Sequence, residues 1–300
     1  MPIFFLIATG YVLAKKFEIN VNTLSKLNFY AFLPAFTFVT IYTNDLSAYI
    51  GKAVLFLFIS MAVNSIFVFI TAGVRKIDNK KKYALMNSVI LFNSGNIGIP
   101  LITLVFSGTK WLDEAIVIQI TVMLVQSLVT NSLGFYNAGR GSLKWQEAVL
   151  SVVKMPTIWA ILAAILLKHF SFRLETTFIW PAFIYLRNAL IGFVLVTLGV
   201  QLSSTKLNNF DLDVLISVIF RLIAAPAASF IILKTLHFEG VLPQVLFISS
   251  ALPSAVNSAL MAIEMDNEPE FAAKSVAFST IFCSVSLIIV IYLSKILFPL

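Results

Sequence analysis

Long apolar runs, separated by short breaks that hold most of the charged residues, occupy almost the whole chain. Ten such runs fall near residues 2–16, 24–43, 52–73, 83–107, 114–136, 148–168, 185–204, 212–236, 242–264 and 274–298. A helix needs roughly 20 apolar residues to cross a bilayer, and most of the runs are about that long. The pattern therefore predicts an all-α integral membrane protein with ten transmembrane helices.

The first five runs and the last five read as two copies of one unit. PIFFLIATGYVLAKKF from Pro2 and PTIWAILAAILLKHF from Pro156 each begin at a proline, continue apolar and end near a basic pair. Because five is an odd number, the second copy enters the membrane in the opposite sense, which gives an inverted repeat. We expect one structural unit with a first repeat at 1–136, a short cytoplasmic connector at 137–147 and a second repeat at 148–300.

The fourth run is interrupted by NSGNIGIP, which begins at Asn93, and the ninth by SSALPSAVNSAL, which contains Pro253. Proline removes a backbone donor and glycine leaves helical geometry easily, so each run is predicted to form two half-helices. We expect the first to unwind near 93–99. Two broken helices at matching positions are the best sequence indication of a transporter binding site. The alternative is a pair of proline kinks packed by small residues.

The two breaks supply most of the candidate site. Half-helix N-termini carry partial positive charge and free N–H groups, which suits carboxylates. Asparagine amides can also donate to an anion or accept from a cation. The candidate substrate-binding residues are Asn93, Ser94, Gly95, Asn96, Gly98, Pro100, Pro253, Ser254, Asn257 and Arg221.

Arg221 is the one arginine predicted near the middle of a span, and its counterpart in the first repeat is about Met61. An arginine at the bilayer centre costs at least about 2.5–3.5 kcal/mol, so a functional or paired role is expected. The acidic residues all fall in breaks or near the ends of spans, so none is placed at its depth. Arg221 therefore either bonds carbonyls and hydroxyls of an unwound segment or faces a path that anions use.

Composition supports a membrane protein, because 59% of residues are hydrophobic and 12% are charged. The net charge of +7 reflects basic residues in the loops, which sets topology and does not indicate nucleic acid. With the N-terminus outside, the inner breaks hold thirteen lysines and arginines and the outer ones seven. This favours the cytoplasmic membrane with both termini outside.

Few residues suit enzyme chemistry. Cys283 is the single cysteine, and the two histidines, His169 and His237, end separate spans without an acidic cluster. The chain also lacks the G-x-x-x-x-G-K-[ST] loop of nucleotide-driven pumps. We therefore expect no enzyme activity, no metal site and no cofactor.

The sequence resembles the auxin efflux carrier family, which includes the plant PIN-type auxin carriers and bacterial permeases for small organic acids. The resemblance covers nearly the whole chain and depends on LIATGYVLAKKFEINVNTLSKLNFYAFLPAFTF, NSGNIGIPL, RLIAAP from Arg221 and ALPSAVNSALMAIEMDNEPEFAAKSVAFSTIFCSVSL. It implies ten helices in two inverted repeats, fourth and ninth helices that cross at Pro100 and Pro253, and a carboxylate bound at the crossing by Asn93, Asn96, Ser254 and Asn257. It also implies an elevator-like movement.

These observations predict a secondary transporter that moves a small organic anion by alternating access. The short connector departs from the long-loop plant carriers and favours a compact prokaryotic permease. The alternative is a sodium-coupled carrier of the bile-acid symporter kind. The expected partners are a carboxylate substrate and the lipid bilayer, while a coupling ion, proton or sodium, and a homodimer remain open alternatives.

Overall fold

In the computed structural model, the described residues are 2–44, 50–139, 154–170, 173–203 and 211–300. Most of the predicted connector at 137–147 lies outside them. Within this part of the chain, the structure is helical, and the one β-type feature is an isolated bridge between Phe92 and Ser254. The helices are α1 (Pro2–Lys16), α2 (Val21–Leu27), α3 (Leu33–Thr43), α4 (Ile50–Val74), α5 (Asn79–Ile90), α6 (Ile99–Val105), α7 (Leu112–Val129), α8 (Phe135–Ala138), α10 (Pro156–His169), α11 (Trp180–Ser203), α12 (Leu212–Ile219), α13 (Ala225–Thr235), α14 (Val241–Ser250), α15 (Val256–Glu264) and α16 (Pro269–Leu297).

Several of these helices are long and apolar enough to cross a membrane. In the described part of the chain there are six, at Thr23–Thr43, Ile50–Val74, Leu112–Ala138, Trp180–Ser203, Leu212–Thr235 and Pro269–Leu297. In α4 only 28% of the most apolar window is buried inside the protein, so much of its apolar surface faces outward. The prediction of an all-α, multi-pass membrane protein is therefore confirmed.

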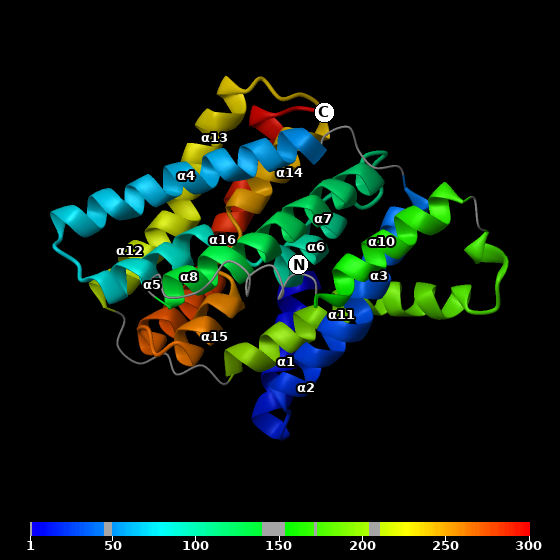
Figure 1. The fold of residues 1–300 in the computed structure, drawn as a ribbon, viewed down its shortest axis with the longest axis horizontal. Helices are drawn as coiled ribbons and strands as arrows, with labels where there is room; N and C mark the ends of the chain where they lie inside the picture. The colour runs from blue at the N-terminus through cyan, green and yellow to red at the C-terminus, as the bar shows by residue number, and fades with distance from the viewer. Residues whose placement is uncertain (1, 45–49, 140–153, 171–172, 204–210) are drawn as a thin grey trace.

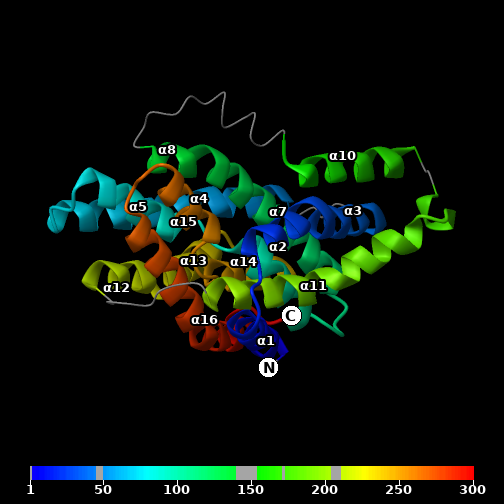
Figure 2. The same cartoon turned by 90° about the horizontal axis from the view of Figure 1, so that it is seen from below.

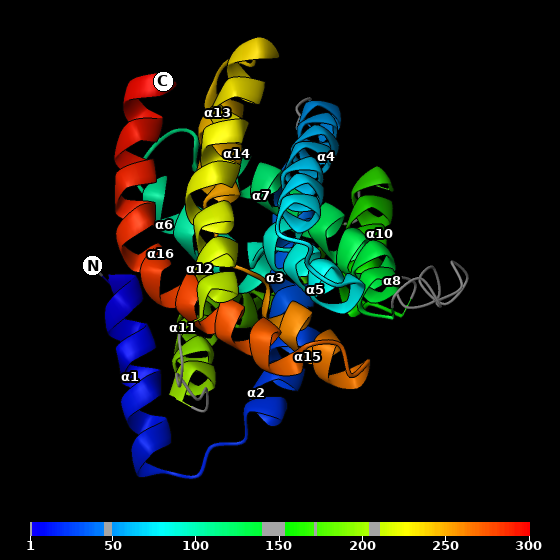
Figure 3. The ribbon, with the colours of Figure 1, turned by 90° about the vertical axis from the view of Figure 1, so that its left-hand side faces the viewer.

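The helices form two groups with separate apolar cores. One core joins α4, α5, α7 and α12 to α16, and the other joins α3, α10 and α11 to residues of α6 and α7. Figures 1 and 2 show the first group at one end of the molecule and α3, α10 and α11 at the other. Within the first group, α4 and α13 lie side by side (Figure 3). The two groups meet at α6 and α7.

Short π-helical turns interrupt several of the long helices. They cover Asn28–Phe32 between α2 and α3, Ser94–Gly98 before α6, Thr130–Gly134 between α7 and α8, and Phe220–Ala224 between α12 and α13. Such turns cost stability and occur frequently at functional sites. The turns therefore indicate where along each helix function should be sought.

The interruptions in the fourth and ninth predicted spans do not both coincide with their prolines. The chain leaves the helix at Leu91 to Asn93, earlier than the predicted 93–99, and Pro100 is accommodated in the first turn of α6. The helix is continuous from Ser94 to Val105. Pro100 follows directly on its π-helical turn, where the regular backbone bonding that a proline interrupts is already altered. Pro253, by contrast, lies inside the break between α14 and α15.

Helices α1 and α11 pack backbone to backbone through two glycines. A methyl group at Gly10 would overlap the carbonyl of Val196, and one at Gly199 would overlap the carbonyl of Ile7. Small residues allow this approach, which drives helix association in membranes, where hydrophobic burial contributes little. The pair is therefore held mainly by close packing.

Gly199→Ala is expected to lower the thermal unfolding midpoint of the purified protein, because the added methyl group forces α1 and α11 apart. Overpacking of this kind costs about 1–3 kcal/mol. Gly192→Ala is the matched control, since Gly192 is in the same helix and has open space around its α-carbon. Equal midpoints for the two variants would contradict the close contact.

Candidate functional site

The two interrupted helices cross at their breaks. The Asn93 N–H donates to the Pro253 carbonyl at 2.9 Å, and the Ala255 N–H donates to the Leu91 carbonyl at 2.9 Å. These bonds make the antiparallel bridge between Phe92 and Ser254. Backbone groups freed at membrane depth must find partners in the protein, and here each break supplies them for the other.

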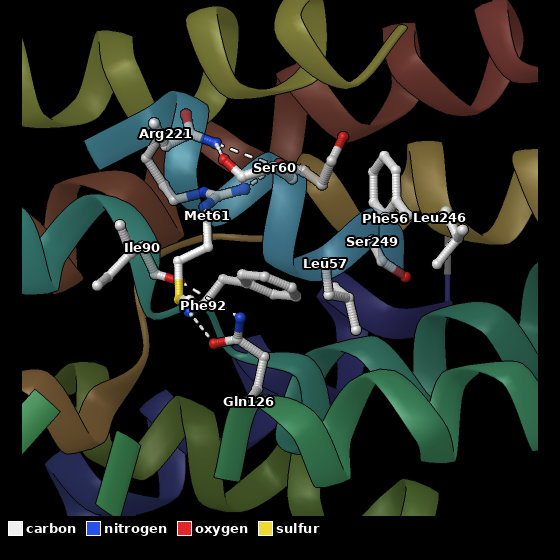
Figure 4. A pocket seen from close by; sticks show the side chains of 12 residues that line it. Phe56, Leu57, Ser60, Met61, Ile90, Phe92, Gln126, Arg221, Leu246 and Ser249 are labelled. Atoms are coloured by element: carbon white, nitrogen blue, oxygen red, sulfur yellow. Dashed lines mark hydrogen bonds between the residues drawn. The ribbon is translucent and has the colours of Figure 1, made fainter. Parts of the chain in front are cut away.

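Two glutamines of α7 support the crossing. Gln126 Nε2 donates to the Ile90 carbonyl, and its Oε1 accepts from the Phe92 N–H, both at 3.3 Å (Figure 4). About two turns earlier in α7, Gln119 Nε2 donates to the Ser94 carbonyl at 2.8 Å, and its Oε1 accepts from Ser249 Oγ at 2.5 Å. Gln119 thus ties the fourth span to the ninth.

A polar cavity of about 520 Å³ lies between the crossing, α7 and the helix group of α3, α10 and α11. Its walls come from both halves of the chain and from both helix groups. The polar residues that line it are Ser25, Lys26, Asn28, Asn93, Ser94, Asn96, Gln126, Ser127, Thr130, Thr197, Gln201 and Asn257. The volume is that of a small-molecule site.

Two helix N-termini open on this cavity. Asn93 caps the first, because its Oδ1 accepts from the Asn96 N–H at 3.1 Å. The second is the start of α15, where Ala255 is the cap residue and offers no side-chain acceptor to the free N–H groups. N-termini carry partial positive charge, so both favour an anion in the cavity.

The asparagines leave amide donors available. Since Asn93 Oδ1 accepts at the cap, its Nδ2 is the remaining group, and it is buried without a partner in the described part of the chain. Asn28 Nδ2 donates to Asn96 Oδ1 at 3.0 Å, so the side chain of Asn28 is joined to those of the break. A buried donor without a partner costs about 1–3 kcal/mol, so this amide is an unusual feature of the cavity wall.

The charge in the described lining of the cavity is positive only. Lys26 is exposed at the cavity, and among the described residues that line it, Lys26 is the one charged side chain. No carboxylate is found in that lining. With the two helix N-termini, this arrangement attracts anions and repels cations.

The structure brings together five of the ten predicted site residues in the cavity wall: Asn93, Ser94, Gly95, Asn96 and Asn257. The other five, Gly98, Pro100, Pro253, Ser254 and Arg221, lie outside the lining. Ser254 is fully buried, where its Oγ donates to the Ser88 carbonyl at 2.6 Å and its N–H to Ser279 Oγ at 3.1 Å. Gly98 packs against Gln119 and Leu252.

Arg221 lies on the opposite side of the crossing, in the wall of a second cavity of about 20 Å³ (Figure 4). Its side chain is 2% exposed and contacts backbone carbonyls of α5 and α14. Of the two roles that the sequence left open, the structure places Arg221 in the first, as a partner of carbonyls beside an unwound segment.

Several residues of the lining were not predicted to bind substrate, among them Lys26, Asn28, Thr130, Thr197 and Gln201. Two of them, Asn28 and Thr130, lie on π-helical turns. Their shared signal is a second polar side chain three or four residues away on the same helix face, as for Gln126 with Thr130 and Thr197 with Gln201. That signal alone does not distinguish cavity residues from polar contacts between helices.

A helical membrane protein in which two interrupted helices meet beside a polar cavity has the architecture of a membrane transporter. The family model described as "Membrane transport protein" matches residues 1–291, so the chain belongs to this family, the auxin efflux carrier family that the sequence motifs resemble. An uncharacterised transporter from Methanothermobacter thermautotrophicus is 26% identical over 293 residues, with 96% of this chain and 94% of the relative covered. Another, from Methanocaldococcus jannaschii, is 24% identical over 271 residues, with 88% and 87% covered.

Proposed function

We propose that this protein is a secondary transporter that binds a small organic anion, through its carboxylate, in the cavity beside the helix crossing. The observation that carries the proposal is the electrostatic character of that cavity. Two helix N-termini open on it, Asn93, Asn96 and Asn257 lie in its wall, Lys26 is the one charged group of the described lining, and no carboxylate competes.

The helix contacts support a ten-helix inverted repeat. The first predicted span packs on the seventh as α1 on α11, and the sixth packs on the second as α10 on α3. The third and eighth spans pack on each other as α4 and α13. Replacing each span by its counterpart in the other repeat turns the contact of the first and seventh spans into that of the sixth and second. The contact of the third and eighth spans is turned into itself, as an inverted repeat requires.

The two helix groups support an elevator-like movement. The crossing, α4, α7 and α16 share one apolar core, whereas α3, α10 and α11 share another, and the cavity lies where the groups face each other. In our proposal, the first group carries the anion past the second. The cavity is bordered by Ser25, Lys26, Met155 and Gln201. These residues lie near the ends of predicted spans that the basic-residue count places inside, so in our proposal this conformation is open to the cytoplasm.

Thermal unfolding of the purified protein against a panel of mono- and dicarboxylates, in sodium-free buffer, tests the proposal. At least one carboxylate is expected to raise the midpoint, since a ligand at 100 times its dissociation constant contributes about 2.7 kcal/mol. The carboxamide of the same acid is the matched control and is expected to have no effect. Uptake of the best ligand into proteoliposomes then measures transport. Stabilisation by the carboxamide equal to that of the acid would contradict an anion site.

A further inference from the structure

The guanidinium of Arg221 joins the ends of two half-helices. Its Nη1 donates to the Val89 carbonyl at 2.6 Å, and its Nη2 donates to the Ser250 carbonyl. Val89 is in the last turn of α5, and Ser250 is the last residue of α14, so both carbonyls directly precede the breaks. The centroid of the Phe92 ring lies 4.9 Å from the guanidinium carbon, Cζ.

A positive charge is favourable at this point. The C-terminal end of a helix carries about half a negative charge, and here two such ends converge at membrane depth. Carbonyl groups left unpaired in that environment are costly. The planar guanidinium fork can reach both carbonyls at once while remaining charged. No acidic side chain forms a salt bridge with Arg221 among the described residues.

The groups around the guanidinium are those that hold an alkali cation. Carbonyl ends of broken helices are the usual ligands of sodium in secondary transporters. Here the same wall also carries the hydroxyl groups of Ser60 and Ser249 and the amide of Asn64, whose Oδ1 is buried without a partner in the described chain. Figure 4 shows Arg221 reaching into this wall beside Ser60 and Met61.

Charge, and not size, keeps a second cation out of this space. The cavity beside the guanidinium measures about 20 Å³, which is enough for about one water. A sodium ion would meet the fixed positive charge at close range. The guanidinium and a bound cation therefore exclude each other.

We infer that Arg221 is a tethered cation, which supplies covalently the positive charge that a bound alkali ion would otherwise provide at the crossing. Two consequences follow. The intact protein gains no stability from sodium at this place, and removal of the guanidinium turns the carbonyl and hydroxyl groups into a site for an alkali cation. A further consequence, which rests on the proposed function, is that anion uptake is the same in sodium and in choline.

The test compares thermal unfolding midpoints of the purified full-length protein in sodium, potassium and choline chloride at constant ionic strength. The intact protein is expected to give one midpoint in all three salts. Arg221→Ala is expected to have a lower midpoint in choline and to regain several degrees, saturably, in sodium or potassium, or with millimolar guanidinium. Arg187→Ala, which removes an arginine away from the crossing, controls for general loss of charge and is expected to show no cation effect.

Either of two results would overturn the inference: a sodium-dependent midpoint of the intact protein, or a folded Arg221→Ala variant that no cation stabilises. If Arg221→Ala cannot be purified in any salt, Arg221→Lys decides. It retains the charge and is expected to fold without a sodium response, and its failure to fold would show that guanidinium shape, not charge, is required. None of these midpoints uses a substrate, so a negative carboxylate screen and a negative cation result are distinguishable.

Discussion

Asn93→Asp is expected to abolish carboxylate binding while the protein remains folded. The replacement has nearly the same shape, and its carboxylate can still accept from the Asn96 N–H, as Asn93 Oδ1 does at 3.1 Å. Aspartate is as good a cap residue as asparagine and interacts favourably with a helix N-terminus. What changes is the other half of the side chain, where an amide donor without a partner becomes a negative oxygen in the cavity wall.

The expected loss of affinity is large. Two like charges 4 Å apart repel by about 4 kcal/mol at an effective dielectric constant of 20, which corresponds to roughly a thousandfold in the dissociation constant. The measurement is carboxylate binding and proteoliposome uptake at pH 8, together with the unfolding midpoint. Asn79→Asp is the matched control, because Asn79 is exposed at the start of α5 and adds the same charge outside the cavity. Wild-type affinity in Asn93→Asp would contradict the anion site.

The two broken runs predicted where two helices are interrupted, and the family resemblance supplied their crossing. Within the described residues, each of the ten apolar runs is largely helical, and six helices are long and apolar enough to cross a bilayer, because bilayer thickness imposes a length that hydropathy records directly. The break itself was displaced by a few residues, since Pro100 proved compatible with the first turn of α6. A proline marks the end of one helix or the start of another equally well, and sequence alone does not distinguish them.

The cavity was only half predictable, for a different reason. Asn93, Asn96 and Asn257 were found because they adjoin the breaks, whereas Lys26 and Gln201 reach the site from helices distant in sequence. Arg221 was predicted to bind substrate because of its depth in a span. Depth alone does not determine on which side of the crossing a side chain lies. Membrane depth is a one-dimensional coordinate, and residues of equal depth meet only if the packing brings their faces together.

The two glycines of NSGNIGIP also have roles that depend on packing, which the sequence alone does not show, and substitutions there give the second prediction with a large effect. Both were expected to allow a departure from helical geometry, but Gly98 has helical dihedral angles (φ −62°, ψ −49°). Its role is close approach, because a methyl group there would overlap Gln119 Nε2 and lie 2.9 Å from Leu252 Cδ1. At Gly95 the same methyl group would lie 3.6 Å from Met123, which is ordinary contact.

Gly98→Ala is therefore expected to disrupt the crossing, and Gly95→Ala is expected to leave it intact. Gln119 is fully buried and could make room only by giving up its bonds to the Ser94 carbonyl and to Ser249. Each buried group left unpaired costs about 1–3 kcal/mol, which exceeds the gain of up to about 1 kcal/mol from replacing a helical glycine by alanine. We expect a clear fall in the unfolding midpoint and near loss of uptake for Gly98→Ala.

The comparison isolates the crossing because the two variants add one identical methyl group three residues apart in the same π-helical turn. For Gly95→Ala, the midpoint is expected to stay the same or rise slightly, as alanine restricts the unfolded chain more than glycine does. A fall in midpoint of equal size in both variants would mean that backbone flexibility, not the Gln119 contact, is what the segment requires. In that case the crossing would be held by its backbone bridge alone, and substitutions of Gln119 would leave stability unchanged.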